Sequence, residues 1–136
     1  NNTPKIRGRL PYILKQARIM QQKYECVITN PPYLGSKFFD AKLTEFMTKK
    51  YPNSKSDTCV AFIEKALQMT AKNSYCALVV MQSWMFLSSF EKFREHLLNN
   101  STIQTMTHMG NNVMKIAFGT CATVWQKTLM PKYIHG

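Results

Sequence analysis

The apolar positions of this chain form short continuous runs that alternate with stripes at helical spacing. Runs of strand length occupy residues 24–29 and 75–81, and further strand-like segments occupy residues 102–109 and 120–128. The first run shows no alternation of apolar and polar residues, which is typical of a strand covered on both faces in a parallel sheet. Helical spacing occurs at residues 11–22, 57–72 and 89–99. The order strand, helix, strand predicts a right-handed parallel crossover and therefore an α/β fold.

The connections between these segments refine the prediction. Residues 1–10 are polar and basic, so we expect a loop there, with Pro11 in the first turn of the first helix. Residues 34–56 form a long connection with one short helix at residues 42–50, and connections of this length are usually functional or mobile. Asp57 is expected to cap the helix that follows. The short connection at residues 110–119 predicts that the last two strands are antiparallel neighbours.

The stretch with the clearest chemistry directly follows the first strand and consists of Asn30, Pro31, Pro32 and Tyr33. The prolines end the strand, because proline has no N–H for the ladder and keeps its neighbour extended. In open α/β sheets, ligands bind at the C-terminal ends of the strands. An amide oxygen and a backbone carbonyl held there can accept two hydrogen bonds from an exocyclic amino group. The tyrosine ring can stack on a planar base.

These four residues closely resemble motif IV of the amino-methyltransferases, (D/N/S)-P-P-(Y/F/W), which use S-adenosylmethionine. The Asn-Pro-Pro-Tyr form is typical of N6-adenine DNA methyltransferases. The wider run from Thr29 to Gly35 looks most like the large restriction and phage-defence enzymes of the PglX type in BREX systems. The resemblance implies transfer of a methyl group to N6 of an adenine in double-stranded DNA. The same motif also occurs in glutamine-amide methyltransferases that act on release factors, and a non-catalytic interaction module is a third interpretation.

The resemblance also implies a fold. Methyltransferases of this class have the sheet order 3-2-1-4-5-7-6 and end in a reversed hairpin. The strands expected here match 4, 5, 6 and 7, which gives a partial Rossmann-like sheet in the order 4-5-7-6 with the last strand antiparallel and flanking helices. In the family, a glycine-containing turn that binds the cofactor precedes motif IV, and residues 1–23 offer only Gly8. Residues 1–136 are therefore expected to be part of a single catalytic domain, namely the half that binds the target base.

Each residue of the motif acquires an implied role. Asn30 and the Pro31 carbonyl would accept the two N6 hydrogens of an adenine flipped out of the duplex. Asn30 would also lie at the edge of the cofactor site. Pro32 belongs to the same catalytic motif. Tyr33 would stack on the adenine ring. The residues that would complete the pocket are Phe118 and Met114, from the loop before the last strand, and Trp84. For Phe118 and Trp84, a place in the core is the simpler interpretation.

Charge points to the same class of partner. The net charge of +11, from 18 basic and 7 acidic residues, favours a polyanion such as DNA. Part of the surplus lies in the long connection after the motif, where Lys37 and Lys55 are candidate substrate contacts. A solvated face is the simpler interpretation of these lysines. The surplus nevertheless favours nucleic acid over a protein substrate.

The remaining chemistry-bearing residues indicate no further site. The four cysteines lie far apart within apolar segments, which predicts small buried side chains, and the three histidines lack metal-ligand spacing, so no metal is expected. No apolar run reaches the length of a membrane helix, so we expect a soluble, cytoplasmic protein. Without the cofactor-binding half, the strand at residues 24–29 would present an unprotected edge, which predicts self-association.

Overall fold

The computed structural model describes residues 3–113 and 119–128. Its centre is a four-stranded sheet in the order β1-β2-β4-β3. The strands are β1 (Tyr24–Thr29), β2 (Thr70–Met81), β3 (Thr102–Gly110) and β4 (Thr120–Gln126). β1 and β2 are parallel, whereas β4 is antiparallel to both β2 and β3. This arrangement confirms the predicted sheet, in which the last strand is reversed and lies between its neighbours.

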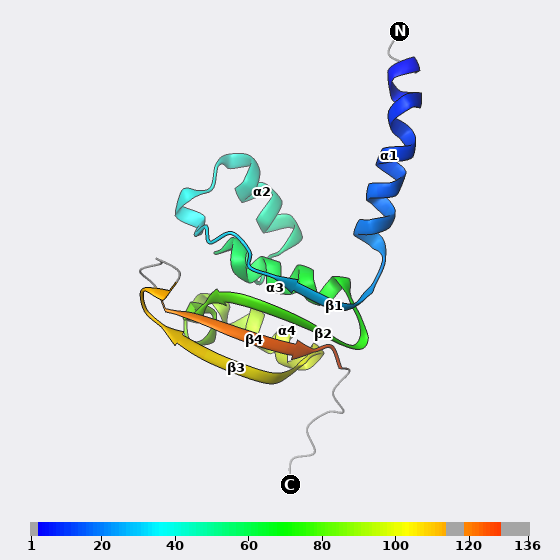
Figure 1. Cartoon of the computed structure of the whole chain (residues 1–136). Coiled ribbons are helices and arrows are strands. Elements are labelled where there is room, and N and C mark those ends of the chain that lie inside the picture. Colours follow the sequence, from blue (N-terminus) through cyan, green and yellow to red (C-terminus); the bar gives the residue numbers. More distant parts are fainter. Residues whose placement is uncertain (1–2, 114–118, 129–136) are drawn as a thin grey trace.

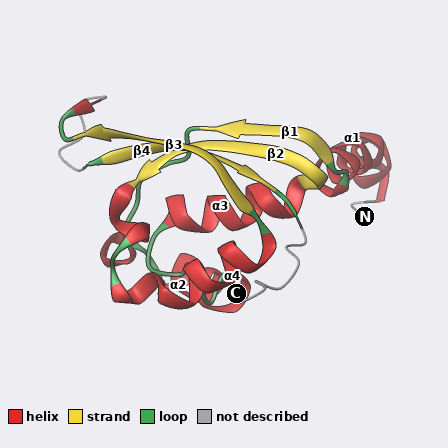
Figure 2. Ribbon diagram, turned by 90° about the horizontal axis from the view of Figure 1, so that it is seen from below, coloured by secondary structure: helices red, strands yellow, loops and turns green. Residues whose placement is uncertain are grey.

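The helices are α1 (Thr3–Gln21), α2 (Ala41–Lys50), α3 (Thr58–Met69) and α4 (Glu91–Asn100). Figure 2 shows α2, α3 and α4 on one side of the sheet. α1 projects from the body at the end where β1 begins (Figure 1). Short 3-10 helices at Ser36–Phe38, Gln82–Met85 and Ser88–Phe90 shape the loops at the opposite end of β1 and β2.

The core lies between the sheet and the two helices α3 and α4. As the helical spacing predicted, Val60, Ile63 and Leu67 face inward from α3. They join a cluster that includes side chains of β2, α4 and β4, among them Cys76, Leu78, Val80, Phe93, Leu97 and Trp125. Burying each large apolar side chain contributes roughly 1.5–3 kcal/mol. This cluster is therefore the main source of stability for the sheet that packs on it.

The first helix begins earlier than predicted. Residues from Thr3 onward are helical, and Pro11 lies inside α1 rather than in its first turn. A proline inside a helix removes one hydrogen bond and crowds the preceding turn, at a cost of roughly 3 kcal/mol, but the helix can continue through it. Several large apolar side chains of α1 are exposed: Leu10, Tyr12, Ile13, Leu14, Ile19 and Met20.

The prediction that β1 is covered on both faces is wrong for the described chain. Ile28 is 74% exposed, and Cys26 is also exposed, in contrast to the other three cysteines. The reason is that α2, α3 and α4 all lie on the opposite face of the sheet, so this face of β1 has no helix over it (Figure 2). Cys59, Cys76 and Cys121 are buried as expected, and burial raises the pKa of the Cys76 thiol to about 11.

The second strand also begins earlier than predicted. α3 ends at Met69 and β2 starts at Thr70, with Asn73 in the left-handed region at φ 61°. Asparagine tolerates this conformation better than most residues, so the chain bends there without leaving the sheet. The register resumes at Tyr75, which lies opposite Cys26 of β1 and Gln126 of β4.

Candidate active site

The Asn-Pro-Pro-Tyr segment lies where β1 ends, as expected. Asn30 is exposed, Pro31 is buried and Tyr33 is half-buried. The hydroxyl of Tyr33 lies 2.7 Å from Oδ1 of Asn30 and 3.0 Å from the carbonyl oxygen of Val79 in β2, and its single proton is shared between these two acceptors. Burial raises the pKa of the Tyr33 hydroxyl, so it stays protonated and acts as a donor. The motif is therefore joined to the neighbouring strand through its tyrosine.

Thr58, at the start of α3, holds the backbone of the motif in place. Its hydroxyl donates to the Pro32 carbonyl at 2.8 Å and accepts from the backbone N–H of Leu34 at 3.1 Å. Its own N–H donates to the Leu34 carbonyl at 3.0 Å. The Pro31 carbonyl takes no part in this set of bonds. One buried threonine thus fixes the two residues on either side of Tyr33.

Asp57 caps α3, which confirms the prediction. Its side chain accepts a hydrogen bond from the backbone N–H of Cys59 at 2.8 Å, and its residue is only 4% exposed. Burial raises the pKa of this carboxyl above its ordinary value of 3.8, and the bonds from Cys59 partly oppose the rise. A bridge between Gly35 and Asp57 also closes the base of the connection that contains α2.

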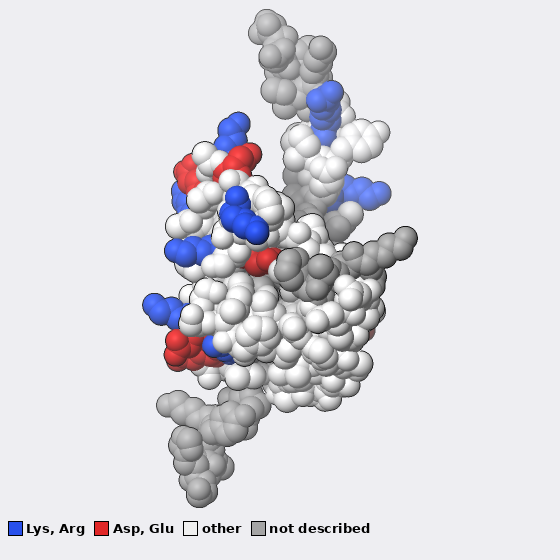
Figure 3. Space-filling view, turned by 90° about the vertical axis from the view of Figure 1, so that its left-hand side faces the viewer, with Lys and Arg blue, Asp and Glu red and all other residues white. Residues whose placement is uncertain are grey.

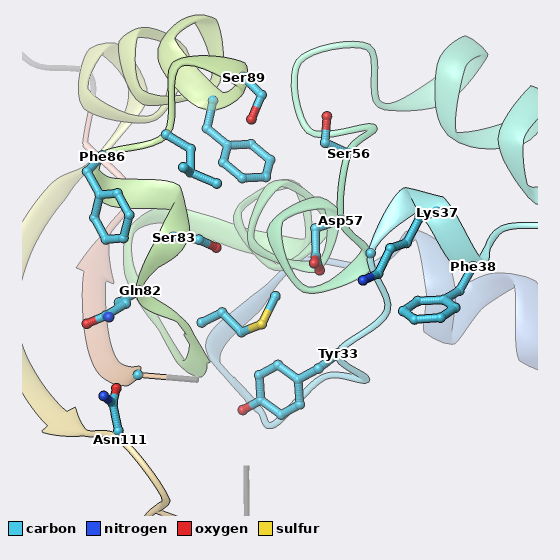
Figure 4. Close-up of a pocket in the computed structure, with 15 residues that line it drawn as sticks. Tyr33, Lys37, Phe38, Ser56, Asp57, Gln82, Ser83, Phe86, Ser89 and Asn111 are labelled. Atoms are coloured by element: carbon cyan, nitrogen blue, oxygen red, sulfur yellow. The ribbon is translucent and has the colours of Figure 1, made fainter. Parts of the chain in front are cut away.

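A cavity of about 910 Å³ opens beside the motif. Figure 4 shows Tyr33, Asp57 and Lys37 on its β1 and α3 side, with Gln82, Ser83 and Phe86 facing them. The full lining comprises Tyr33, Gly35, Lys37, Phe38, Ser56, Asp57, Met81, Gln82, Ser83, Phe86, Leu87, Ser89, Phe90, Asn111 and Gly119. This wall is mostly apolar or aromatic with a few convergent polar groups, which suits a flat heterocycle that carries hydrogen-bonding edges. Asn30 lies outside the lining and is connected to it by the Tyr33 hydroxyl.

The structure places the other predicted site residues in different surroundings. Lys37 lines the cavity, and its Nζ lies 4.8 Å from the centre of the Phe38 ring. Lys55 lines a separate, smaller cavity of about 250 Å³ beside α2. Trp84 lies in the core, 3% exposed and packed against Trp125 and Phe93, so the core interpretation holds and it forms no part of the cavity wall. Met114 and Phe118 lie outside the described residues.

Several lining residues were not assigned a role from the sequence. Gln82 and Ser83 follow β2 directly and face the cavity from its far side. Their position was visible in the sequence, because a residue that follows the second parallel strand must lie at the same edge as Asn30. Asn111, at the end of β3, carried no such signal, because its approach to the cavity depends on the antiparallel pairing of β3 with β4.

The described residues form neither a cluster of metal ligands nor a membrane-spanning helix. Within residues 3–113 and 119–128, no three His, Cys, Asp or Glu side chains gather as metal ligands would. In the same part of the chain, no helix combines the length and the apolar character needed to cross a membrane.

Comparison with known families decides the relationship of this chain. Residues 3–114 match the Eco57I restriction-modification methylase family. The chain belongs to this family. Two curated relatives share substantial identity with it. The adenine-specific methyltransferase BrxX of Escherichia coli O9:H4 (strain HS) is 48% identical over 101 residues, which cover 74% of this chain and 8% of BrxX. The adenine-specific methyltransferase PglX of Lacticaseibacillus casei (strain Zhang) is 33% identical over 126 residues, 90% of this chain and 10% of PglX.

Solved structures confirm the fold of this Eco57I-family chain. A Listeria monocytogenes protein described as a class I S-adenosylmethionine-dependent methyltransferase superposes with a TM-score of 0.59 at 16% identity, over 79% of this chain and 32% of that protein. A structure from a type I restriction-modification system gives a TM-score of 0.62 at 18% identity, over 82% of this chain and 23% of that chain. The type IIG restriction endonuclease BpuSI gives a TM-score of 0.60 at 16% identity, over 79% of this chain and 14% of BpuSI. The sheet is thus part of a class I methyltransferase fold, and the chain spans a tenth or less of the length of its curated relatives.

Proposed function

We propose that this chain forms the target-base side of an adenine-specific DNA methyltransferase, which transfers the methyl group of S-adenosylmethionine to N6 of adenine in a restriction-modification or phage-defence system. The observation that carries the proposal is the Asn30 amide, held by Tyr33 at the end of β1 beside a largely apolar cavity. Membership of the Eco57I methylase family and the similarity to two proteins named as adenine-specific methyltransferases support it.

The residues of the motif would act by binding and orienting the target amine. Asn30 Oδ1 and the Pro31 carbonyl are acceptors, so each can take one N6 hydrogen and leave the nitrogen lone pair directed at its electrophile. S-adenosylmethionine supplies a methyl group on a sulfonium, which is a good leaving group, so no strong base is needed before attack. The Tyr33 ring lines the cavity and offers a stacking surface for the flipped base. The apolar wall excludes water from the amine.

The cofactor itself would be held mainly by residues outside the described part of the chain. A nucleotide-type cofactor needs a glycine turn between a strand and a helix, where the backbone can approach it closely. Among the described glycines, Gly8 lies inside α1, Gly35 follows the motif, Gly110 ends β3 and Gly119 precedes β4, so none of them lies in a turn from a strand into a helix that could take this role before the motif. We therefore propose that residues 1–136 are the target-base half of one catalytic domain, with Asn30 at the edge of the cofactor site.

Double-stranded DNA is the proposed partner. The net charge of +11 supports attraction to phosphates. Figure 3 shows Lys and Arg side chains scattered over one face, with acidic side chains among them, rather than joined in one patch. Charge would then give general attraction, while the cavity would select the base.

We further propose that the isolated chain self-associates through the exposed edge of β1.

The experiment that tests the function is Asn30→Ala in the full-length protein. We expect methylation of adenine in duplex DNA to fall below a tenth of the wild-type rate, whereas binding of S-adenosylmethionine stays nearly unchanged, because Asn30 binds the target amine. Asn99→Ala, at an exposed position of α4, is the matched control and should be fully active. Methylation of a protein amide instead of DNA, or an Asn30→Ala enzyme with near wild-type turnover, would overturn the proposal.

A further inference from the structure

Gln82 occupies a defined position on the wall of the cavity that faces Tyr33 (Figure 4). It is the first residue after β2, and its backbone N–H donates to the carbonyl oxygen of Gly119 at 2.9 Å. Arg94 of α4 steadies the segment that follows, because its Nη1 donates to the carbonyls of Trp84 and Leu87 at 2.9 and 2.8 Å. The backbone of Gln82 is therefore bonded to Gly119, and Arg94 holds the residues that follow it.

The Gln82 carboxamide lies directly against the backbone of Gly119. A Cβ atom at position 119 would be only 2.4 Å from both Cδ and Nε2 of Gln82. Non-bonded atoms do not approach so closely, so a side chain at position 119 would displace the Gln82 carboxamide from the position it has here. Glycine at position 119 therefore leaves the space that the carboxamide occupies.

His108 of β3 determines which end of the carboxamide points outward. Its Nε2 is hydrogen-bonded to Oε1 of Gln82. Because a carboxamide oxygen can only accept, the histidine donates from Nε2 in this arrangement, and the bond directs the Gln82 amino group away from His108. Figure 4 shows the oxygen turned away from the centre of the cavity. Within the described residues, the amino group at Nε2 of Gln82 has no hydrogen-bond partner, so its two N–H donors are available to a ligand.

We propose that Gln82 is a specificity-determining residue that donates a hydrogen bond to a ring nitrogen of the target base, and that His108 is its positioning residue. This inference rests on the proposed function. Asn30 and the Pro31 carbonyl are acceptors that suit an amino group, and Gln82 adds a donor. Adenine presents N1 and N7 as acceptors on either side of its N6 amine, whereas guanine and thymine present a carbonyl in place of the amine and a ring N–H beside it. An acceptor pair combined with a donor therefore selects against guanine and thymine.

Substrate analogues test the inference in the full-length enzyme. The substrates are duplexes in which the target adenine is replaced by 7-deazaadenine or 1-deazaadenine, each of which lacks one acceptor nitrogen. We expect one of them to lower the wild-type kcat/KM by about tenfold, the loss of a single hydrogen bond. Gln82→Ala should show the same loss with adenine and no further loss with that analogue. Gln82→Glu, which keeps the size of the side chain but lacks the donors, should behave in the same way.

Two further variants separate this role from a structural one. His108→Ala should reduce kcat/KM with adenine but cause no additional loss in the Gln82→Ala background, because it acts through Gln82. Gln104→Ala, an exposed glutamine of β3 paired with Gln126 at 3.2 Å, is the matched control and should resemble wild type. A Gln82→Ala enzyme that still distinguishes the analogue, or a wild type that distinguishes neither, overturns the inference alone. A wild type that methylates no adenine overturns the proposed function and this inference with it.

Discussion

At the scale of single residues, Tyr33 combines two roles that the motif alone did not separate. The sequence suggested only a stacking ring. The structure adds a hydroxyl that donates toward Asn30 Oδ1 and the Val79 carbonyl. Because Oδ1 is also the atom proposed to accept an N6 hydrogen, we expect the hydroxyl to orient the Asn30 amide before a base binds.

Replacing Tyr33 should therefore have graded effects. Tyr33→Phe keeps the ring but releases Asn30, and we expect a loss of about 1 kcal/mol of transition-state stabilisation, roughly fivefold in kcat. Tyr33→Ala also removes the ring and should cost considerably more. Single-turnover methylation of duplex DNA would measure both. If Tyr33→Phe were as fast as wild type, the hydroxyl would have no part in orienting Asn30.

Asp57 allows a similar separation of charge from hydrogen bonding. Asp57→Ala removes the acceptor for the Cys59 N–H, and we expect the free energy of unfolding to fall by about 1 kcal/mol. Asp57→Asn keeps the acceptor and loses the charge. Since burial raises the pKa of this carboxyl in the folded state, the folded protein binds more protons than the unfolded protein between 3.8 and the raised value. The stability of the wild type should therefore decrease as the pH rises through that interval.

Urea unfolding over a range of pH would test this sign. Asp57→Asn should be at least as stable as wild type near neutral pH, and its advantage should disappear below pH 3.8. An Asp57→Asn protein that is less stable than wild type at neutral pH, with equal stability in acid, would indicate that the carboxylate is net favourable in the fold.

At the scale of elements, the position of the motif depends on α3 rather than on β1 alone. The strand and the prolines bring Asn30 and Tyr33 to the sheet edge, but Thr58 at the start of α3 fixes the carbonyls of Pro32 and Leu34. Thr58→Val, which keeps the shape of the side chain, should lower the free energy of unfolding by about 1 kcal/mol and reduce methylation. Thr58→Ser retains the hydroxyl, so we expect it to keep most of the wild-type stability and most of the wild-type methylation. Equal activity in the valine and serine variants would exclude this clamp.

The sequence predicted the elements whose signals are local. α3 and its cap at Asp57, the start of β4 at Thr120 and the short helix after the motif follow from side-chain spacing and capping chemistry. The exposure of Ile28 could not be predicted in this way, because an apolar run indicates a strand but not how many of its faces are covered. The predicted start of α1 was too late in the chain, because the sequence does not distinguish a proline tolerated inside a helix from one in its first turn.

The candidate site was predictable to the same extent. Asn30, Pro31, Pro32 and Tyr33 form one contiguous motif, and their place at a strand end follows from it. Gln82 and His108 come from β2 and β3, and their contact depends on the insertion of β4 between these strands. The interpretation of Trp84 was ambiguous because aromatic residues serve equally well in a core and in a pocket wall, and only its packing against Trp125 and Phe93 decides for the core.

At the scale of the whole molecule, the sheet has one covered face and one open face. Apolar or small side chains on the open face come from β1, β2 and β4, and include Cys26, Ile28, Tyr75 and Ala77, which are paired across β1 and β2. The outer edge of β1 contains no lysine or proline that would discourage pairing with another chain.

The isolated chain should therefore self-associate. We expect sedimentation at micromolar concentration to show dimers or larger species, and Ile28→Lys to shift the distribution toward monomer because it places a charge at a 74% exposed position of β1. Lys72→Ile, which adds an apolar residue at an exposed position of β2 away from the β1 edge, is a useful comparison. A clean monomer for the unmodified chain would show that this edge is protected.

The place of β4 has a consequence for how the molecule is made. β4 is synthesised after β2 and β3, yet it lies between them and pairs with both. While the chain emerges from the ribosome, β2 and β3 have no direct ladder to each other: β2 can pair with β1 alone, and β3 has no partner strand until residues 120–126 are made. A stop codon just before Thr120 would consequently remove the seam of the sheet rather than its margin. We expect the nascent chain to be most sensitive to proteases during that interval, although residues 30–33 are translated long before.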